Sequence, residues 1–464
     1  MSVNRLEVVG GLTVARTEVA AGEVLLQEAA LVTGPGRAGL PVCITCYARV
    51  DGEYYCNGCS WQCCGEDCEL REEHREECQV FREKDIYAAW DCVDQPTLTM
   101  DFMGPHRLLL AIKKNPELRE ILGINVENDL RKKRFNIKYY VDCEDVITKY
   151  IRDQCGLTGF TEDEILTALG LFELYGQPLQ NGAKAVFPGL LRMRHSCRPN
   201  CYFSLGPDNS ITVRASQDLV AGQEVTRSYV DVMKCNLFRR RDLEKEFFVD
   251  CDCERCRDGG EMDTNYGGLV SPQYNNLVFV PADPRDEASP WINKTAAGVE
   301  LSGPECCQEL DLLRRKCEAG IAETQGNPAT IEFILNNPGE WDVLPRQGQV
   351  MMDVKKCLVE AYGNMQGATY DVLETEKIRT KVTICNELLQ LYARFHPGYN
   401  YNAAMLHYEA AHAIYGLHVK GDHSLSAEGR EHCEAVERIC REEQSGSLYD
   451  QVKQFVVVLK EAMM

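Results

Sequence analysis

Eight side chains of the kinds that bind metal ions stand as four pairs between residues 43 and 78. The pairs are Cys43-x2-Cys46, Cys56-x2-Cys59, Cys64-x3-Cys68 and His74-x3-Cys78. A gap of two or three residues lets both side chains of a pair reach one ion, and zinc takes four ligands, preferably thiolate and imidazole. The pattern predicts two closed zinc sites. A segment with so many charges and so few aliphatic side chains builds little core, so we expect zinc to supply its folding energy.

A second group of cysteines follows at Cys251-x-Cys253-x2-Cys256. Three thiolates need a fourth ligand to complete a tetrahedron, and the candidate is Cys197 in the run Arg194-His-Ser-Cys-Arg-Pro-Asn200. We expect a third, structural zinc ion here, which would tie residues 195–200 to the cysteine group. The alternative, three incidental cysteines, is weak at this spacing.

The side chains of these motifs need a scaffold, and β-like runs lie on both sides of the first cysteine group. Residues 5–33 alternate apolar and polar side chains around turn signals at Gly10–Gly11 and Ala21–Gly22. Residues 185–230 return to short β-like runs such as Ile211–Val213. We expect the two β blocks to pack together although about 150 residues separate them.

Helices and a connector are expected around these blocks. Residues 82–155 have helical spacing and hold most of the local basic charge, including the run Arg131–Arg134. Thr161–Glu164 has the form of a capping box before an apolar run, so a helix is expected to start there. Residues 258–300 are rich in Gly, Pro and Asp and predict a loop-rich connector with one strand-like run at Leu277–Val280.

From about residue 301 to the end, apolar side chains recur at helical spacing. The recurring positions are Cys306, Leu310, Leu313, Cys317 and Ile321, then Ile378, Val382, Cys385, Leu389 and Tyr392, then Leu448, Val452, Phe455 and Leu459. Ser447–Asp450 is the expected cap of the last helix. The pattern suggests an antiparallel helical array without a strict repeat. The cysteines of this region are expected to be small core residues and not ligands.

Composition and charge narrow the classes of function. The chain has 464 residues, 24 of them Cys, with 50 Lys+Arg and 71 Asp+Glu, which gives a formal net charge of −21. This acidic balance argues against direct nucleic-acid binding, which needs a cationic surface. The chain has no apolar run of about 18 residues and its N-terminus has no signal-peptide pattern. We therefore expect no membrane association, a reducing compartment in which cysteines bind metal, and localisation in cytoplasm and nucleus.

The first cysteine group resembles a MYND zinc finger over its whole length. The resemblance implies interleaved ligation, with Cys43, Cys46, Cys64 and Cys68 on one ion and Cys56, Cys59, His74 and Cys78 on the other. Cys63 is spare and is expected to be a packing residue. MYND fingers dock proline-containing peptides, and the many acidic residues of this group fit a peptide partner better than a phosphate backbone.

The order of all the motifs resembles the SET-and-MYND (SMYD) protein lysine methyltransferases, in particular a divergent arthropod-type member. Residues 194–200 are similar to the family's NHSCxPN motif, Gly222–Tyr229 to GEE(L/V)TxSY, and Cys251–Cys256 to the post-SET CxCxxC. The resemblance implies an α+β fold: a SET β-fold with a pseudoknot, interrupted by the MYND finger and a helical insert, and an all-α, TPR-like C-terminal domain. The implied divisions are 1–42 (N-terminal SET part), 43–78 (MYND finger), 79–165 (helical SET insertion), 166–232 (core SET), 233–257 (post-SET zinc site), 258–300 (connector) and 301–464 (helical domain).

The resemblance also implies a reaction. S-adenosylmethionine would bind on one face of the SET fold, and a lysine of a histone or non-histone protein would enter from the other through a narrow apolar channel. Methyl transfer to an amine needs in-line positioning and a neutral amine, which an apolar channel favours. By the resemblance, Tyr229 orients the amine. The residues expected at the cofactor are Gly11, Leu12, Arg194, His195, Tyr229 and Phe247.

Several positions differ from the family's pattern. Val9 replaces the first glycine of Gly-x-Gly-Leu, and Phe247 replaces a tyrosine of the channel. Arg194 stands where the family has the Asn that contacts the cofactor, and its permanent charge would either repel the sulfonium or reach the cofactor's carboxylate. His195 is expected to offer its backbone to the adenine. In insect-like members the connector often holds a CxxC zinc ribbon; with Ser271–Tyr274 at the first pair, we expect a ribbon without metal.

Two hypotheses therefore remain. The first is an S-adenosylmethionine-dependent protein lysine methyltransferase with MYND-mediated protein binding. The second is a pseudoenzyme with weak or lost catalysis, a zinc-dependent adaptor or repressor component that holds protein partners. The family prior favours the first hypothesis, and Arg194 and Phe247 favour the second.

Overall fold

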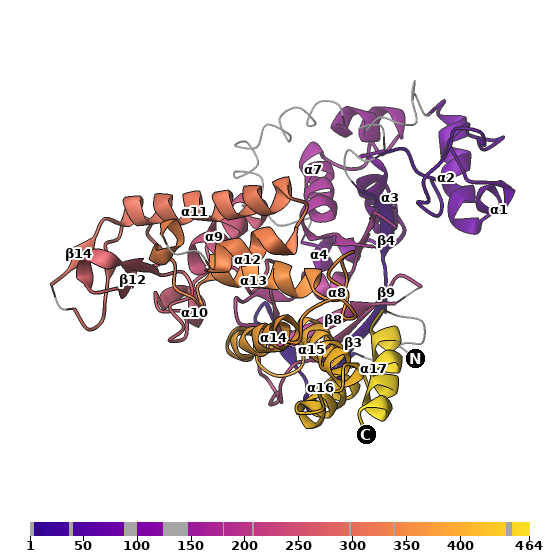
Figure 1. Ribbon diagram of the computed structural model, residues 1–464. Coiled ribbons are helices and arrows are strands. Elements are labelled where there is room, and N and C mark those ends of the chain that lie inside the picture. The colour runs from indigo at the N-terminus through magenta and orange to yellow at the C-terminus, as the bar shows by residue number, and fades with distance from the viewer. Residues whose placement is uncertain are drawn as a thin grey trace. The chain divides into compact units, whose positions relative to one another are not determined.

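The computed structural model describes residues 4–36, 40–87, 100–123, 147–179, 181–206, 208–296, 298–336, 339–441 and 448–464. The basic run Arg131–Arg134 and Ser447 of the expected cap lie outside these ranges. Within them helices and short strands are mixed, so the fold is α+β (Figure 1). No helix in the described ranges is both long and apolar enough to cross a membrane.

The chain divides into two compact units, which are described separately. The first unit holds residues 1–2, 27–192 and 208–212, and the second holds residues 3–26, 193–207 and 213–464. Three further strands are β3 (Val24–Ala29), β8 (Cys201–Leu205) and β9 (Ser210–Ala215).

The first unit combines a small antiparallel sheet with short helices. In the sheet, β6 (Ala183–Val186) lies between β4 (Val32–Pro35) and β5 (Gln177–Pro178). The helices and helical turns are α1 (Glu66–Glu69), α2 (Glu72–Glu83), α3 (Met103–Lys114), α4 (Leu118–Ile121), η1 (Tyr150–Gln154), α7 (Glu162–Gly170), η2 (Leu171–Tyr175) and α8 (Pro188–Leu191). The pairing of β4 with β6 joins the two β blocks that the sequence places far apart.

The predicted capping box starts α7. The backbone N–H of Glu164 donates to the Thr161 hydroxyl (3.3 Å), and the Glu164 carboxylate accepts from the Thr161 N–H (2.8 Å). Both donors would otherwise be unsatisfied at a helix start. On the neighbouring α3, a Cβ at Gly104 would lie 2.3 Å from the ring of Phe172, so only glycine permits this approach to η2.

In the second unit the N-terminal strands pair with the segment that follows β9. β1 (Leu6–Val9) and β2 (Leu12–Ala15) form a hairpin. The β2 residue Val14 is bridged to Glu224, and β10 (Thr226–Arg227) pairs in parallel with β7 (Arg194–His195). The expected packing of residues 5–33 with residues 185–230 is thus confirmed within each unit.

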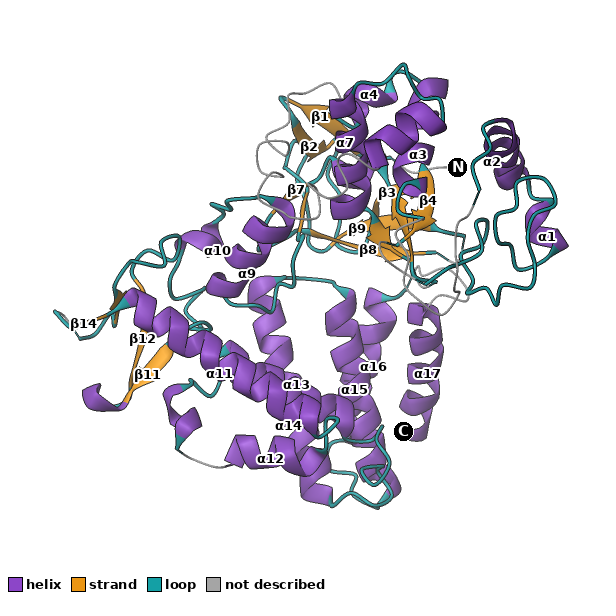
Figure 2. Cartoon of the chain, turned by 90° about the horizontal axis from the view of Figure 1, so that it is seen from above, coloured by secondary structure: helices purple, strands orange, loops and turns teal. Residues whose placement is uncertain are grey.

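Helices make up most of the second unit. They are α9 (Asn236–Asp242), η3 (Leu243–Phe247), α10 (Glu254–Arg257), η4 (Pro272–Tyr274), α11 (Gly303–Glu323), α12 (Pro328–Asn336), η5 (Glu340–Val343), α13 (Gln349–Ala361), α14 (Thr375–Phe395), α15 (Tyr401–Val419), α16 (Ser426–Ile439) and α17 (Leu448–Ala462). The helix α15 packs against α14, α16 and α17, and Figure 2 shows α15, α16 and α17 side by side. The helical array predicted from residue 301 onward is confirmed.

The predicted apolar faces are correct for two of the three helices. On α11 the side chains of Cys306, Leu310, Leu313 and Cys317 are buried, and the α14 positions Ile378, Val382, Cys385 and Tyr392 are buried as well. On α17 the prediction was wrong at Phe455, which is 43% exposed. The prediction holds at Val452 and Leu459, and Val456 is buried in place of Phe455.

The connector holds more regular structure than its composition indicates. The strand-like run at Leu277–Val280 is confirmed as part of β12 (Leu277–Pro281). Three further strands complete an antiparallel sheet of order β11-β12-β13-β14: β11 (Leu269–Ser271), β13 (Trp291–Ile292) and β14 (Glu300–Leu301). Strands of two or three residues are too short to give a period-two pattern, so the sequence did not indicate them.

Candidate functional site

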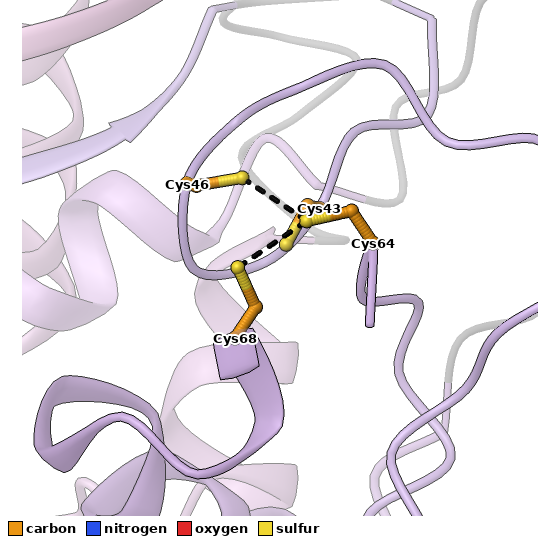
Figure 3. A group of neighbouring side chains, drawn as sticks. All are labelled: Cys43, Cys46, Cys64 and Cys68. Atoms are coloured by element: carbon orange, nitrogen blue, oxygen red, sulfur yellow. Dashed lines mark hydrogen bonds between the residues drawn. The ribbon is translucent and has the colours of Figure 1, made fainter. Parts of the chain in front are cut away.

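The structure brings the first predicted ligand set together. The Sγ atoms of Cys43, Cys46, Cys64 and Cys68 lie within 4.8 Å of one another. Figure 3 shows them converging from two loop segments and the start of α1, with 3.5 Å between the sulfurs of Cys46 and Cys64 and 3.3 Å between those of Cys64 and Cys68. Four thiols at these separations match the size of a tetrahedral zinc site. The group could therefore hold one metal ion.

The second set interleaves with the first. The ligand atoms of Cys56, Cys59, His74 and Cys78 also lie within 4.8 Å of one another. The Cys59 sulfur lies 3.6 Å from His74 Nε2, and the sulfurs of Cys56 and Cys78 are 3.6 Å apart. His74 and Cys78 are one turn apart on α2, so both face the same point. The interleaved grouping implied by the family resemblance is what the structure has.

Local backbone geometry explains why each Cys-x2-Cys pair converges. Tyr47 N–H donates to Cys43 O (3.0 Å), and Ser60 N–H donates to Cys56 O (2.9 Å). Both turns end on a residue with left-handed backbone, φ 65° at Tyr47 and φ 59° at Ser60. The two pairs therefore form the same tight turn, which aims both thiols of a pair at one ion.

A glycine that the sequence analysis did not single out belongs to the second set. A Cβ at Gly58 would lie 2.6 Å from the Cys78 sulfur, which is too close for any side chain. Gly58 N–H also points at the Cys56 sulfur (3.3 Å). The spare Cys63 is buried, 1% exposed, as expected for a packing residue.

Arg107 fastens this cysteine module to the rest of the first unit. Its guanidinium lies on α3 and donates to both carboxylate oxygens of Glu77 (2.5 and 2.6 Å), the residue next to the ligand Cys78. It also donates to Ile44 O (2.9 Å), inside the first Cys-x2-Cys turn, and to Thr33 O on β4 (3.0 Å). One buried cation therefore connects α2, a metal-binding turn and the sheet.

The third ligand set forms in the second unit. The sulfurs of Cys197, Cys251, Cys253 and Cys256 lie within 4.8 Å of one another, with 3.4 Å between those of Cys197 and Cys256. Cys197 comes from the loop after β7, and Cys256 lies on α10. The structure therefore completes the Cys-x-Cys-x2-Cys run with the fourth thiol that the sequence analysis selected.

Buried charges lie behind this third set. Arg239 and Arg255, both fully buried, each bind Glu261, with distances of 2.7 and 3.0 Å to Glu261 Oε2. Two guanidinium groups on one carboxylate leave a surplus positive charge in the interior, which is costly without a counter-charge. Four thiolates around a divalent zinc ion carry a net charge of −2. The surroundings therefore fit a metal-bound set of thiolates better than four neutral thiols.

Tyr229 is held from three sides in the second unit. Its hydroxyl donates to the carbonyl oxygen of Met193 (2.9 Å), and its backbone N–H donates to His195 Nδ1 (3.0 Å). The rings of His195 and Phe247 each lie 5.2 Å from the Tyr229 ring, and the Arg227 guanidinium lies 4.4 Å from that ring. Burial raises the pKa of the Tyr229 hydroxyl, so this group stays protonated and acts as a hydrogen-bond donor.

The hydrogen bonds fix the tautomer of His195. Because Nδ1 accepts from the Tyr229 N–H, the ring proton of the neutral imidazole sits on Nε2. Nε2 lies 3.2 Å from the Cys197 sulfur and can donate to it. One imidazole therefore links the backbone of Tyr229 to the third metal set.

Asn200 is a structural residue of this site that the sequence analysis did not assign. Its side-chain oxygen accepts from Thr226 N–H (2.9 Å), and its amide donates to Glu224 O (2.8 Å). The side chain is buried, and it holds the loop after β7 against the strand that leads to Tyr229. Its position at the end of the Arg194–Asn200 motif was the one feature of the sequence that could have indicated this role.

Arg194 forms an ion pair that the sequence analysis did not predict. Its Nε and Nη2 donate to the two carboxylate oxygens of Glu224 (2.7 and 3.2 Å), and this hydrogen bonding raises the pKa of the guanidinium further. The Arg194 side chain is 62% exposed. The side-on ion pair leaves the Nη1 edge available to another acceptor.

Gly11 and Leu12 lie at the turn between β1 and β2. Gly10 and Gly11 have φ of 57° and 83°, and no atom lies within 4 Å of where a Cβ would stand on either. The next residue, Thr13, accepts from the Val225 N–H (2.8 Å), which places this turn beside the strand segment that leads to β10. Gly11 and Leu12 are thus near the segment of Glu224, on the opposite edge from Arg194.

Two cavities in the second unit were not indicated by the sequence. The β10 cavity, about 420 Å³, is lined by Arg227, Ser228 and Val230 around Tyr229 and by residues of the helical domain. The α13 cavity, about 210 Å³, is lined from α13, α14 and α15 and by Asp231 and Tyr266. The two cavities share Asp231, Lys356, Tyr392 and Asn402. Their lining residues come from well-separated parts of the chain, so no local sequence motif indicates either cavity.

Comparisons with known proteins agree with this geometry. Residues 14–230 match the SET domain family. The Drosophila melanogaster protein "SET domain-containing protein SmydA-8, isoform A" is 29% identical over 318 residues, which cover 64% of this chain and 65% of that protein. "N-lysine methyltransferase SMYD2-B" of Xenopus laevis is 33% identical over 133 residues, 28% of each chain. "Histone-lysine N-methyltransferase Smyd1" of Mus musculus is 30% identical over 112 residues, 22% of this chain and 23% of that protein.

The match to each of these relatives spans less than two thirds of the relative's length. The SET domain match at residues 14–230 is accompanied by three metal-binding sets and a helical C-terminal region, in the order that the motifs indicated. The chain therefore contains a SET domain and is similar to SET-and-MYND (SMYD) proteins, from which it diverges.

Proposed function

We propose that this protein is a protein-lysine N-methyltransferase that uses S-adenosylmethionine and acts on a histone or non-histone protein. The observation that carries the proposal is the setting of Tyr229, whose hydroxyl is fixed by Met193 O while its ring lies between His195 and Phe247. The SMYD relatives named as lysine methyltransferases support the same activity.

Each part of this setting has a use in methyl transfer to an amine. The Tyr229 hydroxyl donates to Met193 O, which fixes the orientation of the phenolic oxygen that would position the substrate nitrogen. The rings of Tyr229, His195 and Phe247 offer the amine little solvation. A lysine with an ordinary pKa near 10.4 would therefore lose its proton more readily there, as the nucleophile must.

The proposed cofactor residues are Gly11, Leu12, Arg194, His195, Tyr229 and Phe247. S-adenosylmethionine would supply the electrophilic methyl group of its sulfonium. The site fits an amino-acid carboxylate in one respect, because the Nη1 edge of Arg194 is not used by Glu224. It fits a bulky ligand in another, because the Gly10–Gly11 turn carries no side chains and has open space around it.

We propose that three zinc ions occupy the three ligand sets. Their twelve donors are eleven thiols and one imidazole, the donor types that zinc prefers. Each set supplies four donors, the number that a closed structural zinc site takes. The ions would hold the module and the Cys197 loop in place and take no part in the reaction.

We further propose that residues 43–78 act as a MYND finger that docks proline-containing peptides, with residue divisions as given by the family resemblance. The proposed localisation is cytoplasm and nucleus, and direct nucleic-acid binding is not expected for a chain of net charge −21.

Two specific observations favour a second candidate function, a zinc-dependent adaptor without catalysis. Arg194 stands in an ion pair with Glu224 where the family has a neutral asparagine, and Phe247 lacks the hydroxyl of the family's second channel tyrosine. Such a protein would keep the three metal sets and bind partners without turnover.

Calorimetry with S-adenosylmethionine and S-adenosylhomocysteine, followed by transfer of a radiolabelled methyl group to mixed core histones and to cell extract, tests the two candidates. The methyltransferase is expected to bind both ligands and to transfer the label, and Tyr229→Phe to lower the transfer rate by about 10–100-fold with unchanged zinc content. Failure of the unmodified protein to bind either ligand would refute the methyltransferase and support the adaptor.

A further inference from the structure

The α13 cavity contains a buried polar group that no described residue satisfies. Tyr266 lines the cavity and is 1% exposed, and its buried hydroxyl has no hydrogen-bond partner among the described residues. An unsatisfied buried hydroxyl costs free energy, which a ligand in the cavity would recover. Burial raises the pKa of Tyr266 well above its usual value, and Asp353 raises it further, so the hydroxyl is neutral and close to a carboxylate.

The same cavity has an excess of carboxylates. Its lining includes Asp231, Asp353, Glu360 and Glu409 against one cation, Lys356. Glu409 is paired with Lys381 at 2.6 Å, and the other three carboxylates form no ion pair within the described residues. Burial raises the pKa of Asp353 to about 6, and the nearby Asp231 adds to the rise. A partly buried carboxylate without a cation is costly, so the cavity favours a positively charged ligand.

Apolar walls limit the shape of that ligand. The cavity is lined by methionines Met233, Met352 and Met405 together with Leu388 and Val359. Methionine side chains adapt to an aliphatic stem. At about 210 Å³ the cavity is smaller than the pockets that hold drug-sized molecules, which begin at about 300 Å³. A single lysine or arginine side chain, with an apolar stem and a cationic head, has the matching chemistry.

The position of the cavity connects it to the proposed reaction. Ser228 and Val230, the chain neighbours of Tyr229, line the β10 cavity, although Tyr229 itself does not. The β10 cavity shares Asp231 and Tyr392 with the α13 cavity, so the two cavities adjoin each other. An extended peptide with its target lysine at Tyr229 could place a neighbouring side chain in the α13 cavity.

We propose that the α13 cavity is a specificity subsite that binds a second lysine or arginine of the protein substrate, near in sequence to the methylated lysine. The cationic head would lie between Asp353 and the Tyr266 hydroxyl, and the stem would pack on the methionines. This inference rests on the proposed function only for the placement of the target lysine at Tyr229. Binding of a cationic side chain in the α13 cavity does not itself require methyl transfer.

The test uses the full-length zinc-loaded protein and labelled peptides of glycine and serine in fluorescence anisotropy. Each peptide carries one central lysine and a second lysine at successive positions on either side. A matched set carries norleucine, which keeps the stem without the charge, in place of the second lysine. We expect one spacing at which the two-lysine peptide binds about tenfold tighter or more than its norleucine match, as a charged hydrogen bond provides.

Variants test whether the preference for a second lysine arises in the α13 cavity. Asp353→Asn should reduce the difference between the lysine and norleucine peptides to about twofold or less, and Tyr266→Phe should weaken the two-lysine peptide by about threefold. The control Glu376→Gln removes one exposed carboxylate of α14 that does not line the cavity, and it should leave the preference unchanged. Circular dichroism and zinc content verify that each variant is folded.

Three results would overturn the proposal. These are equal binding of lysine and norleucine peptides at every spacing, a lysine preference that survives Asp353→Asn, and tighter binding of free spermidine than of the best peptide, which would assign the cavity to a polyamine. Failure of the methyltransferase proposal is measured separately, by the cofactor calorimetry, so a lysine preference without cofactor binding would leave a cation subsite on an adaptor.

Discussion

Replacing Asp353 by asparagine is expected to make the protein more stable at neutral pH, although it removes a charged group. Burial raises the pKa of this carboxyl from 3.8 to about 6, with Asp231 nearby. The hydrogen bond from Gln349 Nε2 to Asp353 Oδ2 (3.1 Å) can be kept by the asparagine carbonyl, and the side-chain volume hardly changes. The substitution therefore removes the cost of ionising a buried group with little other change.

The sign and size of the stability change caused by Asp353→Asn follow from proton linkage. Because the folded-state pKa lies above the unfolded value, the folded protein binds more protons between about pH 4 and pH 6, and its stability falls as the pH rises through this window. A difference of about two pKa units corresponds to about 3 kcal/mol once both states are ionised. The linkage relation gives about 3 kcal/mol near pH 7.5 and about 1 kcal/mol near pH 4.5. The free energy of unfolding of Asp353→Asn is expected to exceed that of the unmodified protein by these amounts.

Thermal unfolding followed by circular dichroism measures the effect. At about 2–4 °C per kcal/mol for a domain of 150–250 residues, the variant should melt roughly 6 °C or more above the unmodified protein near pH 7.5 and roughly 2 °C above it near pH 4.5. The control Asp422→Asn should give no such rise, because hydrogen bonds from Ser424 hold the pKa of that exposed carboxyl below its usual value. An unchanged or lower Tm near pH 7.5, or the same rise at both pH values, would refute the reasoning.

Further predictions concern the metal sets and the charges behind them. Elemental analysis should find three zinc ions per chain, and a strong chelator should unfold the cysteine module; a stoichiometry of two would leave one ligand set without metal. Gly58→Ala should lower the zinc content by one ion, because its Cβ would stand 2.6 Å from the Cys78 sulfur, whereas Gly65→Ala, where nothing lies within 4 Å, should keep it. Glu261→Gln should destabilise the protein by about 3–5 kcal/mol in chemical denaturation, because the buried Arg239 and Arg255 lose their counter-charge; a loss below about 1 kcal/mol would contradict this role.

The ligand sets could be predicted from the sequence because their geometry is mostly local. A Cys-x2-Cys turn or a His-x3-Cys helical turn fixes two donors at once, whatever the rest of the chain does. The interleaved grouping of the first four pairs came from the family resemblance, and the addition of Cys197 to Cys251, Cys253 and Cys256 rested on counting donors to four. The structure brings together all three predicted sets.

Features set by tertiary packing were harder to predict. The ion pair of Arg194 with Glu224 was not predicted, because Glu224 lies 30 residues away and only the pairing of β7 with β10 brings the two side chains together. On α17 the stripe through Phe455 and the stripe through Val456 have nearly equal apolar character, and packing against α15 selects the second. Neither the ion-pair partner of Arg194 nor the buried face of α17 can be read from the local sequence pattern.

The cation subsite is of the same kind. Asp353 lies within an amphipathic helix where one acidic residue is unremarkable, and Tyr266 lies in a stretch that predicted a loop. Their significance comes only from their position on opposite sides of a cavity whose wall is completed by α14 and α15. If Asp353→Asn raises stability and also abolishes the lysine preference, then the Asp353 charge lowers the stability of the fold but is needed for binding. Such a trade-off is typical of a functional site.

The zinc ligands match the family's pattern whereas several cofactor positions differ from it, yet the structure connects the two groups of residues. Met193 holds the Tyr229 hydroxyl, His195 accepts from the Tyr229 backbone, and Cys197 is both a partner of His195 Nε2 and a member of the third ligand set. These three residues alternate along one short segment, so a change in the position of Cys197 must be passed to the residues that hold Tyr229. Loss of the third zinc ion should therefore reduce methyl transfer even where the fold survives.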